Sequence, residues 1–326
     1  MNLILEDILA ARIRIKHLVH KTPLLRSRQL NRLLGCDLYF KAESLQKVGA
    51  FKARGVCHFL SREETGNPVV TTYSSGNHGQ ALAWAASQFE RRAVVFMPED
   101  ASQAKVAAVR GYGGEVRFAG LSGDDRQAAC EAFAAETGAL VVPPFDHPHI
   151  IAGQGTVLLE IVEELPTFDA LLVPTGGGGL LAGNALALKA LRRNAQIFAC
   201  EPELAADARA SLASGELQRI EYAKTIADGA RNLCLGNLNW DIIRRHVDGG
   251  LAAPEFLIVE AMRELATFTK QYVEPSGALG LACLMGHRDQ FKNKTVVIIL
   301  SGGNIALEDY ARLITSHGAK HGSASR

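Results

Sequence analysis

The residue with the clearest chemical potential in this chain is a lysine in an apolar setting. Lys52 follows Ala50 and Phe51 and lies two residues before Arg54. Partial burial lowers the pKa of a lysine because the ammonium loses hydration, and a nearby cation lowers it further. A neutral amine is what a Schiff base with an aldehyde requires. Taken alone, Lys52 is therefore either a covalent catalyst or an ordinary lysine at the start of a helix.

A second group of polar side chains follows a predicted strand at 69–73. These residues are Ser74, Ser75, Asn77, His78 and Gln80, with Gly76 and Gly79 among them. Ligands of open parallel sheets bind at the carboxyl ends of strands, and free N–H groups at a helix start favour an anion. A polar turn that only caps a helix is the alternative. Five polar side chains in seven residues exceed what a cap needs, so we interpret this as a ligand loop suited to a carboxylate.

Four consecutive glycines form the strongest single signal. Gly176, Gly177, Gly178 and Gly179 stand between a predicted strand at 170–173 and a predicted helix at 180–191. Such a loop offers backbone N–H groups to a phosphate at a helix N-terminus. The competing reading is a dinucleotide site, because the glycines and Ala182 fit G-x-G-x-x-A and an acid ends the next strand. That fingerprint usually opens a domain, whereas here it follows a complete α/β unit.

Two carboxylates, Glu201 and Asp207, stand six residues apart across a predicted turn. With an intervening carbonyl they could supply half of an octahedral oxygen site for a divalent cation. The alternative is a charged helix start with no ligand. Elsewhere, Ser301 ends a predicted buried strand at 295–300 and precedes two glycines, so we expect it to meet the same ligand as the other strand-end loops.

Composition excludes several classes of protein. The 326 residues are 48% hydrophobic and 21% charged, with a net charge of +1, so no strong field attracts nucleic acid or an anionic membrane. No apolar run approaches the roughly 18 residues that span a bilayer, and the N-terminus does not resemble a signal peptide. The six cysteines are scattered, as in a reduced cytoplasmic protein. We therefore expect a cytoplasmic localisation.

Strands and helices alternate along most of the chain. Strands are predicted at 36–43, 69–73, 93–97, 115–118, 139–142, 170–173, 196–200 and 295–300, with helices between most of them. Helices at 203–214, 238–246 and 254–271 are predicted between the last two strands. This rhythm favours parallel sheets covered by helices on both faces. We expect two α/β domains: a small one at 69–146 and a large, discontinuous one assembled from 1–60 and 148–326.

Together and in this order, these motifs resemble the fold-type II pyridoxal-phosphate enzymes. The similarity covers nearly the whole chain and is nearest to the serine racemase and serine/threonine dehydratase branch, including the L-threo-3-hydroxyaspartate dehydratases. The resemblance implies an α/β fold of two open, twisted, parallel-sheet domains like the tryptophan synthase β subunit. It also implies a homodimer that acts on a small amino acid.

The resemblance implies a role for each motif at the cofactor. Lys52 would carry pyridoxal 5'-phosphate covalently, and Ser75 would face the other side of the substrate Cα. Asn77 would bond the phenolic oxygen of the cofactor, the glycines 176–179 would hold its phosphate, and Ser301 would contact its pyridine nitrogen. Phe51 is the remaining residue expected at the cofactor.

Substrate and metal residues follow from the same resemblance. Arg126 takes the place of a racemase arginine near the substrate carboxylate, and Ser74 and His78 belong to the carboxylate loop. The spacing of Glu201 and Asp207 matches the Mg²⁺ or Mn²⁺ site of the branch, with Ala205 giving its carbonyl; this favours the metal site over a plain helix start. Nucleotide-binding positions of eukaryotic racemases are matched in part by Lys47, Gln80, Lys105, Tyr112, Lys270 and Asn304, but Arg28 replaces a small hydroxyl residue.

The function implied is β-elimination. A hydroxy amino acid such as L-serine, L-threonine or L-threo-3-hydroxyaspartate would yield a 2-oxo acid and ammonia, with serine racemase activity at the same site. A β-replacement enzyme of the cysteine-synthase type shares the fold and is one alternative. An NAD-dependent dehydrogenase is another, although it leaves Lys52 without a role. A non-catalytic sensor would have lost Lys52 or Ser75, and both are present.

Overall fold

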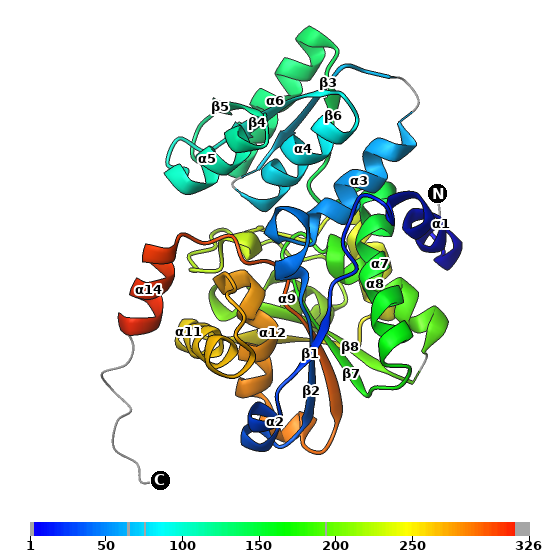
Figure 1. Ribbon diagram of the computed structural model, residues 1–326, viewed down its shortest axis with the longest axis vertical. Helices are drawn as coiled ribbons and strands as arrows, with labels where there is room; N and C mark the ends of the chain where they lie inside the picture. Colours follow the sequence, from blue (N-terminus) through cyan, green and yellow to red (C-terminus); the bar gives the residue numbers. More distant parts are fainter. Residues whose placement is uncertain (1–2, 64–65, 75, 193, 317–326) are drawn as a thin grey trace.

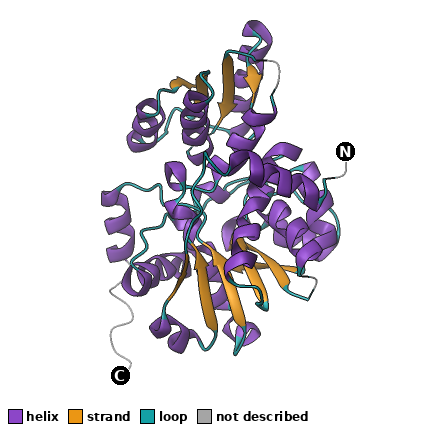
Figure 2. Cartoon of the chain, turned by 45° about the vertical axis from the view of Figure 1, so that its right-hand side comes forward, coloured by secondary structure: helices purple, strands orange, loops and turns teal. Residues whose placement is uncertain are grey.

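The chain forms two separate sheets joined by helices and loops. The computed structural model describes residues 3–63, 66–74, 76–192 and 194–316. Figure 1 shows the smaller sheet in cyan and green at the top and the larger one below it. Turned by 45°, the two groups of strands remain apart, with helices and loops between them (Figure 2). The predicted fold class, two parallel α/β sheets, is confirmed.

The larger sheet has six strands in the order β1-β2-β10-β7-β8-β9. All neighbours are parallel except β1 and β2. The strands are β1 (Leu24–Arg26), β2 (Asp37–Lys41), β7 (Ala170–Pro174), β8 (Gln196–Pro202), β9 (Gly249–Ala253) and β10 (Thr295–Ile299).

Side chains alternate between the two faces of this sheet, and both faces are buried. Leu171 and Val173 pack with the helices α1, α7, α8 and α10, whereas Leu172 packs with α2, α11 and α12. Because successive strand residues point to opposite faces, a strand covered on both sides must be apolar throughout. That requirement explains the unbroken apolar run of β7 and places its C-terminal end, and the glycines beyond it, at one edge of the sheet.

The smaller sheet has four parallel strands in the order β5-β4-β3-β6. They are β3 (Val69–Tyr73), β4 (Arg92–Met97), β5 (Glu115–Phe118) and β6 (Leu140–Val141). Val95 packs towards α4, and Phe96 packs against Phe133 of α6 on the other face. The sheet thus contains only strands from the predicted small domain; the domain limits themselves, 69–146 against 1–60 with 148–326, stay a prediction.

Helices cover both sheets and connect their strands. They are α1 (Leu5–Ile15), α2 (Arg28–Leu34), α3 (Lys52–Arg62), α4 (Asn77–Gln88), α5 (Gln103–Gly111), α6 (Gly123–Thr137), α7 (Pro148–Glu164), α8 (Gly179–Leu191), α9 (Asp207–Ser214), α10 (Asn237–His246), α11 (Glu255–Glu264), α12 (Pro275–Gly286), α13 (Arg288–Phe291) and α14 (Leu307–Ser316). None of the helices in the described ranges has the length and apolar character needed to cross a membrane.

The structure differs from the predicted elements at several places. Strands β1 and β9 were not predicted: β1 has three residues, and β9 is rich in glycine and alanine, which have low strand propensity. The predicted helix at 203–214 begins with a separate 3₁₀ turn, Glu203–Ala205. The predicted helix at 254–271 divides into α11 and a π-helical segment, Leu265–Thr269.

Candidate active site

Loops from two neighbouring strands of the large sheet are paired beside Lys52. The backbone N–H of Phe51 donates to the carbonyl of Ser301 at 3.1 Å, and that of Gly303 donates to the carbonyl of Gly49 at 2.9 Å. Ala50 and Gly302 form an antiparallel bridge between these bonds. The loop after β10 therefore fixes the backbone that leads into α3, and it brings Ser301 next to the start of that helix.

Lys52 is the first residue of α3 and is partly buried. Its Nζ donates to the carbonyl of Pro144 at 2.7 Å and lies 5.2 Å from the centre of the Phe51 ring. Burial lowers the pKa of Lys52 to about 8. The direction agrees with the sequence prediction, but the second cause invoked there is wrong: Arg54 does not contribute, because its charge is neutralised elsewhere.

Arg54 belongs to a buried network beneath α3. Its guanidinium donates to Glu43 at 2.7 Å and to Glu160 at 2.7 Å, and Lys41 Nζ donates to Glu160 at 2.6 Å. All four side chains are less than a tenth exposed. The two positive charges, on Lys41 and Arg54, equal the two negative charges, on Glu43 and Glu160. The network joins β2, α3 and α7. A buried pair that loses one partner leaves an uncompensated charge, so the network locks α3 against α7.

The polar loop after β3 contacts the large sheet through Asn77. Asn77 Nδ2 donates to Glu274 Oε1 at 2.5 Å, and Asn77 Oδ1 accepts from Asn304 Nδ2 at 2.7 Å. Ser74 Oγ accepts the backbone N–H of Gly76 at 3.1 Å. Ser75 lies outside the described residues. Asn77 therefore already has partners that hold its amide at the junction of the two sheets.

His78 is buried and uncharged. Its Nε2 lies 3.1 Å from the carbonyl of Val142, which requires that nitrogen to carry the proton. Burial, with a smaller contribution from the Lys52 charge, lowers the pKa of His78 to about 3. Its Nδ1 is buried with no hydrogen-bond partner in the described part of the chain. A neutral imidazole with one free acceptor nitrogen can bind a donor but cannot supply a proton from Nε2.

The glycine loop packs too tightly for any side chain. A Cβ at Gly177 would lie 2.4 Å from the ring of Phe145, and one at Gly176 would lie 2.7 Å from the carbonyl of Gly229. Gly178 has φ of +93°, a conformation that favours glycine. The loop ends at Gly179, the first residue of α8, where helical N–H groups have no intrahelical acceptor. This backbone is suited to an anion such as a phosphate.

Ser301 is buried at the end of β10. Its hydroxyl lies 3.4 Å from the carbonyl of Ser276, and the Ser276 hydroxyl in turn accepts the N–H of Gly229 at 2.9 Å. A serine gives a ligand atom a neutral hydroxyl instead of a carboxylate. Contacts therefore run from the glycine loop to Ser301 and on to Lys52. Gly229 packs on the loop and bonds to Ser276, Ser276 bonds to Ser301, and the backbone of Ser301 is paired with that of Phe51 next to Lys52.

Of the predicted metal residues, Glu201 belongs to β8, Ala205 ends the 3₁₀ turn that follows, and Asp207 begins α9. Glu201 accepts the N–H groups of Ala208 at 2.9 Å and Arg209 at 2.7 Å, and Asp207 Oδ2 is buried with no hydrogen-bond partner in the described residues. Burial raises the pKa of Glu201 to about 8 and that of Asp207 to about 7, and the charge of Asp207 adds to the effect on Glu201. Ala205 is buried in the turn between them.

Two buried carboxylates that resist ionisation fit a cation that would neutralise them. Three or more His, Cys, Asp or Glu side chains arranged for a metal are not found in the described ranges, so this pair would need the carbonyl of Ala205 as a further ligand.

Arg126 is the predicted substrate residue that the structure connects least. Its guanidinium donates to the carbonyl of Leu121 at 3.0 Å, on its own helix start, and its Nε is buried without a partner in the described residues. Among those residues it makes no hydrogen bond to Ser74, Asn77 or His78.

Sequence reasoning missed Glu274, Asp228 and Asn239. Glu274 is buried against Asn77, and Asp228 forms an ion pair with Lys105 of α5 that joins the two sheets. Burial raises the pKa of Glu274. A carboxylate directly before Pro275 reads as a helix start, so sequence alone gave no reason to place it at the site.

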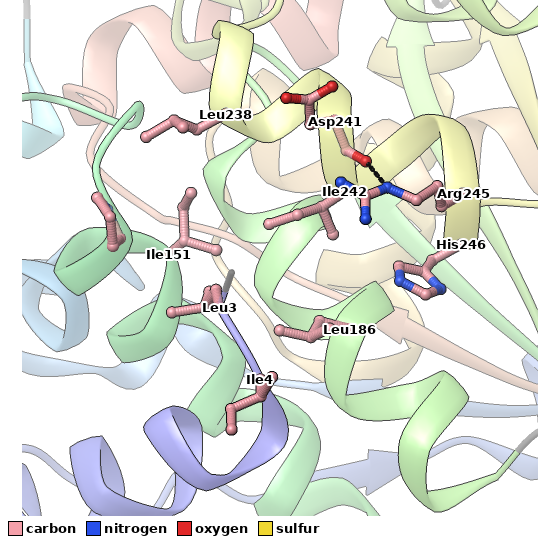
Figure 3. A pocket seen from close by; sticks show the side chains of 10 residues that line it. Leu3, Ile4, Ile151, Leu186, Leu238, Asp241, Ile242, Arg245 and His246 are labelled. Carbon is pink, nitrogen blue, oxygen red and sulfur yellow. Dashed lines mark hydrogen bonds between the residues drawn. The ribbon is translucent and has the colours of Figure 1, made fainter. Parts of the chain in front are cut away.

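A surface pocket of about 250 Å³ lies elsewhere, between α1, α7, α8 and α10. Figure 3 shows its mostly aliphatic lining, with Asp241, Arg245 and His246 along α10. No predicted site residue lines it, so the strand-end cluster around Lys52 remains the candidate active site.

Known proteins of similar sequence and structure identify the family of this chain. The family described as "PALP: Pyridoxal-phosphate dependent enzyme" matches residues 15–302. An L-threo-3-hydroxyaspartate ammonia-lyase of Saccharomyces cerevisiae is 45% identical over 95% of either chain, and a serine racemase of Schizosaccharomyces pombe is 40% identical over 96% of this chain and 99% of that protein.

Solved structures give the same result. The crystal structure of serine racemase from Dictyostelium discoideum superposes with a TM-score of 0.87 at 39% identity, covering 94% of this chain and 99% of that one. Maize serine racemase superposes with a TM-score of 0.92 at 36% identity, covering 97% and 98%. The resemblance predicted from the motifs is therefore confirmed, and the chain belongs to the pyridoxal-phosphate dependent enzyme family.

Proposed function

We propose that this enzyme converts a small hydroxy amino acid into a 2-oxo acid and ammonia, through loss of the β-hydroxyl as water and later uptake of water, and that it also racemises serine. The observation that carries the proposal is the position of Lys52, whose pKa is lowered to about 8 and whose Nζ donates to Pro144, next to the Phe145 that packs on the glycine loop. Relatives named L-threo-3-hydroxyaspartate ammonia-lyase, serine racemase and L-threonine ammonia-lyase support this substrate class. L-Serine, L-threonine and L-threo-3-hydroxyaspartate are the proposed substrates.

The residues present fit pyridoxal 5'-phosphate. Lys52 would hold it covalently, the glycines 176–179 would hold its phosphate, Asn77 would bond its phenolic oxygen, and Ser301 would face its pyridine nitrogen beside Phe51. When bound, this cofactor supplies an aldehyde for the substrate amine and an electron sink for charge that develops at Cα.

The proton steps belong to the chain itself. Lys52, once released, removes the Cα proton because its lowered pKa leaves a large neutral fraction near pH 8. If Ser75 returns a proton to the opposite face of Cα, the product is the enantiomer. If Lys52 instead returns the abstracted proton to the β-hydroxyl, that group leaves as water, and hydrolysis of the remaining enamine with one water gives a 2-oxo acid and ammonia. The Ser301 hydroxyl does not hold a pyridine nitrogen protonated as a carboxylate would, which disfavours transamination.

Ser74 and Arg126 are proposed to bind the substrate carboxylate, and His78 is proposed to bind another group of the substrate. His78 is neutral and can accept at Nδ1, so it would orient a donor such as the substrate amine or hydroxyl, whereas Arg126 would have to turn from Leu121 to reach a carboxylate. Movement of the small sheet towards the large one would bring Arg126 closer to the substrate carboxylate.

A divalent cation, a homodimer and a cytoplasmic location complete the proposal. Glu201, Asp207 and the carbonyl of Ala205 would bind Mg²⁺ or Mn²⁺, because the two buried carboxylates need a positive partner. The family resemblance supports the homodimer. Six free cysteines, five of them buried, fit a reducing compartment.

A substrate panel tests the function directly. The protein reconstituted with pyridoxal phosphate is incubated with L- and D-serine, threonine and 3-hydroxyaspartate, and 2-oxo acid and enantiomer are measured with Mg²⁺ and with chelator. Elimination without added sulfide supports the proposal. Turnover of O-acetylserine only when sulfide is present would instead identify a β-replacement enzyme. Ser75→Ala should lose racemisation, and surviving racemisation would refute its role.

A further inference from the structure

Helix α10 has two faces with different surroundings. Leu238, Ile242 and Arg245 line the surface pocket, as Figure 3 shows. Asn239, by contrast, is completely buried and faces the glycine loop. A fully buried asparagine in a helix is costly unless its amide forms hydrogen bonds, so the bonds it forms indicate what it does.

The amide of Asn239 holds one carbonyl of the glycine loop. Its Nδ2 donates to the carbonyl of Gly177 at 2.7 Å and lies 3.5 Å from the carbonyl of Phe145. The backbone N–H of Gly236, just before α10, donates to the same Gly177 carbonyl at 3.1 Å. Asn239 is itself held, because its own N–H donates to Asp146 at 3.1 Å. The Gly177 carbonyl therefore has two donors on one side.

Fixing this carbonyl fixes the next N–H. In a planar trans peptide the C=O of one residue and the N–H of the following residue point in opposite directions. With the Gly177 carbonyl held towards α10, the N–H of Gly178 must point away from α10. Gly178 also has φ of +93°, so the peptide could rotate readily without this restraint.

We infer that Asn239 is a positioning residue for the phosphate of the cofactor. The inference rests on the proposed function, in which Gly176–Gly179 hold that phosphate. Hydrogen bonds to an ionised group are strong and directional, so a rotated Gly178 peptide would lose one and present a carbonyl to the phosphate instead. Asn239 would thus act through the backbone without touching the ligand.

The orientation of the amide sharpens the prediction. Asn239 Oδ1 has no hydrogen-bond partner in the described part of the chain, so the side chain serves here as a donor. Asn239→Asp keeps the shape but removes the donor and places carboxylate oxygens against the carbonyls of Gly177 and Phe145. Asn239→Ala removes the donor without adding charge.

Comparing pyridoxal phosphate with pyridoxal isolates the effect on phosphate. Both aldehydes can react with Lys52, but only one carries the phosphate. Dissociation constants of the two are measured on the cofactor-free wild type and on both variants by visible absorbance, and the ³¹P shift of the bound phosphate is recorded. Asn239→Asp is expected to weaken pyridoxal phosphate binding by about tenfold or more, the worth of one hydrogen bond to a charged group. Pyridoxal binding should change less than about twofold, since it lacks the group concerned.

Asn184 of α8 provides a matched control. It is also fully buried, its Nδ2 donates to the carbonyls of Leu180 at 2.8 Å and Gln154 at 3.3 Å, and its Oδ1 also lacks a partner in the described residues. Asn184→Ala removes a buried amide without freeing the Gly177 carbonyl. It should lower thermal stability as Asn239→Ala does while leaving the ratio of the two dissociation constants unchanged.

Each outcome decides the inference. A selective loss of pyridoxal phosphate binding with a moved ³¹P shift in either Asn239 variant supports it. Equal weakening of both ligands, or no weakening, overturns it, and so does the same selectivity in Asn184→Ala. A wild type that binds neither aldehyde would refute the proposed function and the inference together, which distinguishes that failure from a failure of the Asn239 argument alone.

Discussion

Ionisation of Lys52 should control how fast the cofactor-free protein captures its cofactor. Burial lowers the pKa of this amine from 10.5 to about 8. At pH 7.5 about a quarter of the amine is then neutral, against roughly one part in a thousand for an ordinary lysine. Because only the neutral amine attacks an aldehyde, the rate per molecule near neutral pH should exceed that of a free lysine by about two orders of magnitude from this term alone.

Stopped-flow absorbance measures this rate. Cofactor-free protein is mixed with pyridoxal phosphate across pH 6 to 10, with Nα-acetyl-lysine in solution as the control and Lys52→Met as the blank. The protein rate should rise with a midpoint near pH 8 and level off above it, whereas the control rate keeps rising towards pH 10. A protein rate that also rises without levelling to pH 10 would refute the burial argument.

The lowered pKa of Lys52 also predicts that the difference in stability between wild type and Lys52→Met depends on pH. The folded-state pKa is lowered, so between about pH 8 and 10.5 the unfolded chain binds more protons and stability increases with pH. Below pH 8 the buried ammonium costs the cofactor-free wild type up to about 3 kcal/mol relative to a neutral isostere. Lys52→Met should therefore unfold at higher denaturant than wild type at pH 7, and the gap should close by about pH 10.5. A constant gap would contradict this reasoning.

Three further predictions concern the buried charge network, the glycine loop and the proposed cation site. Arg54→Met leaves two buried carboxylates with a single cation and should lower the unfolding free energy by about 3 to 5 kcal/mol in urea denaturation; a loss below about 1 kcal/mol would contradict the network. Gly177→Ala forces the ring of Phe145 to move and should weaken pyridoxal phosphate binding about tenfold or more, whereas Gly111→Ala, with open space around it, should not. Mg²⁺ should raise the Tm of wild type but not of Asp207→Asn, and equal shifts in both would exclude the proposed cation site.

Apolar runs and the polar or glycine residues that follow them predicted most strands of the fold. Strand β7 is apolar at every position because both faces are covered, and β3 and β10 end in polar and glycine residues because their loops meet at the edge of the sheets. Strand β9 was missed because its pairing with β8, not its Gly-Gly-Leu-Ala-Ala sequence, makes it a strand. The strand propensity of the residues does not predict an edge strand such as β9.

The candidate site could be predicted only where its residues carry their own signal. Lys52, the glycines 176–179 and Ser301 lie in short sequence motifs that indicate a chemical role by themselves. Asn239 and Glu274 form hydrogen bonds with residues about sixty and two hundred positions away in sequence, so only the folded chain reveals these contacts. Arg54 was misread for the same reason: its position two residues after Lys52 suggested a charge effect, but its partners Glu43 and Glu160 neutralise it.

The central claim is that Lys52 carries out cofactor-dependent elimination, and product stoichiometry tests it most directly. Wild type and Lys52→Ala, each incubated with pyridoxal phosphate and L-threo-3-hydroxyaspartate, L-serine or L-threonine, are assayed for 2-oxo acid and ammonia. Wild type should release the two in equal amounts from at least one substrate, and Lys52→Ala should release neither. Equal activity in Lys52→Ala, or ammonia without 2-oxo acid, would contradict the account.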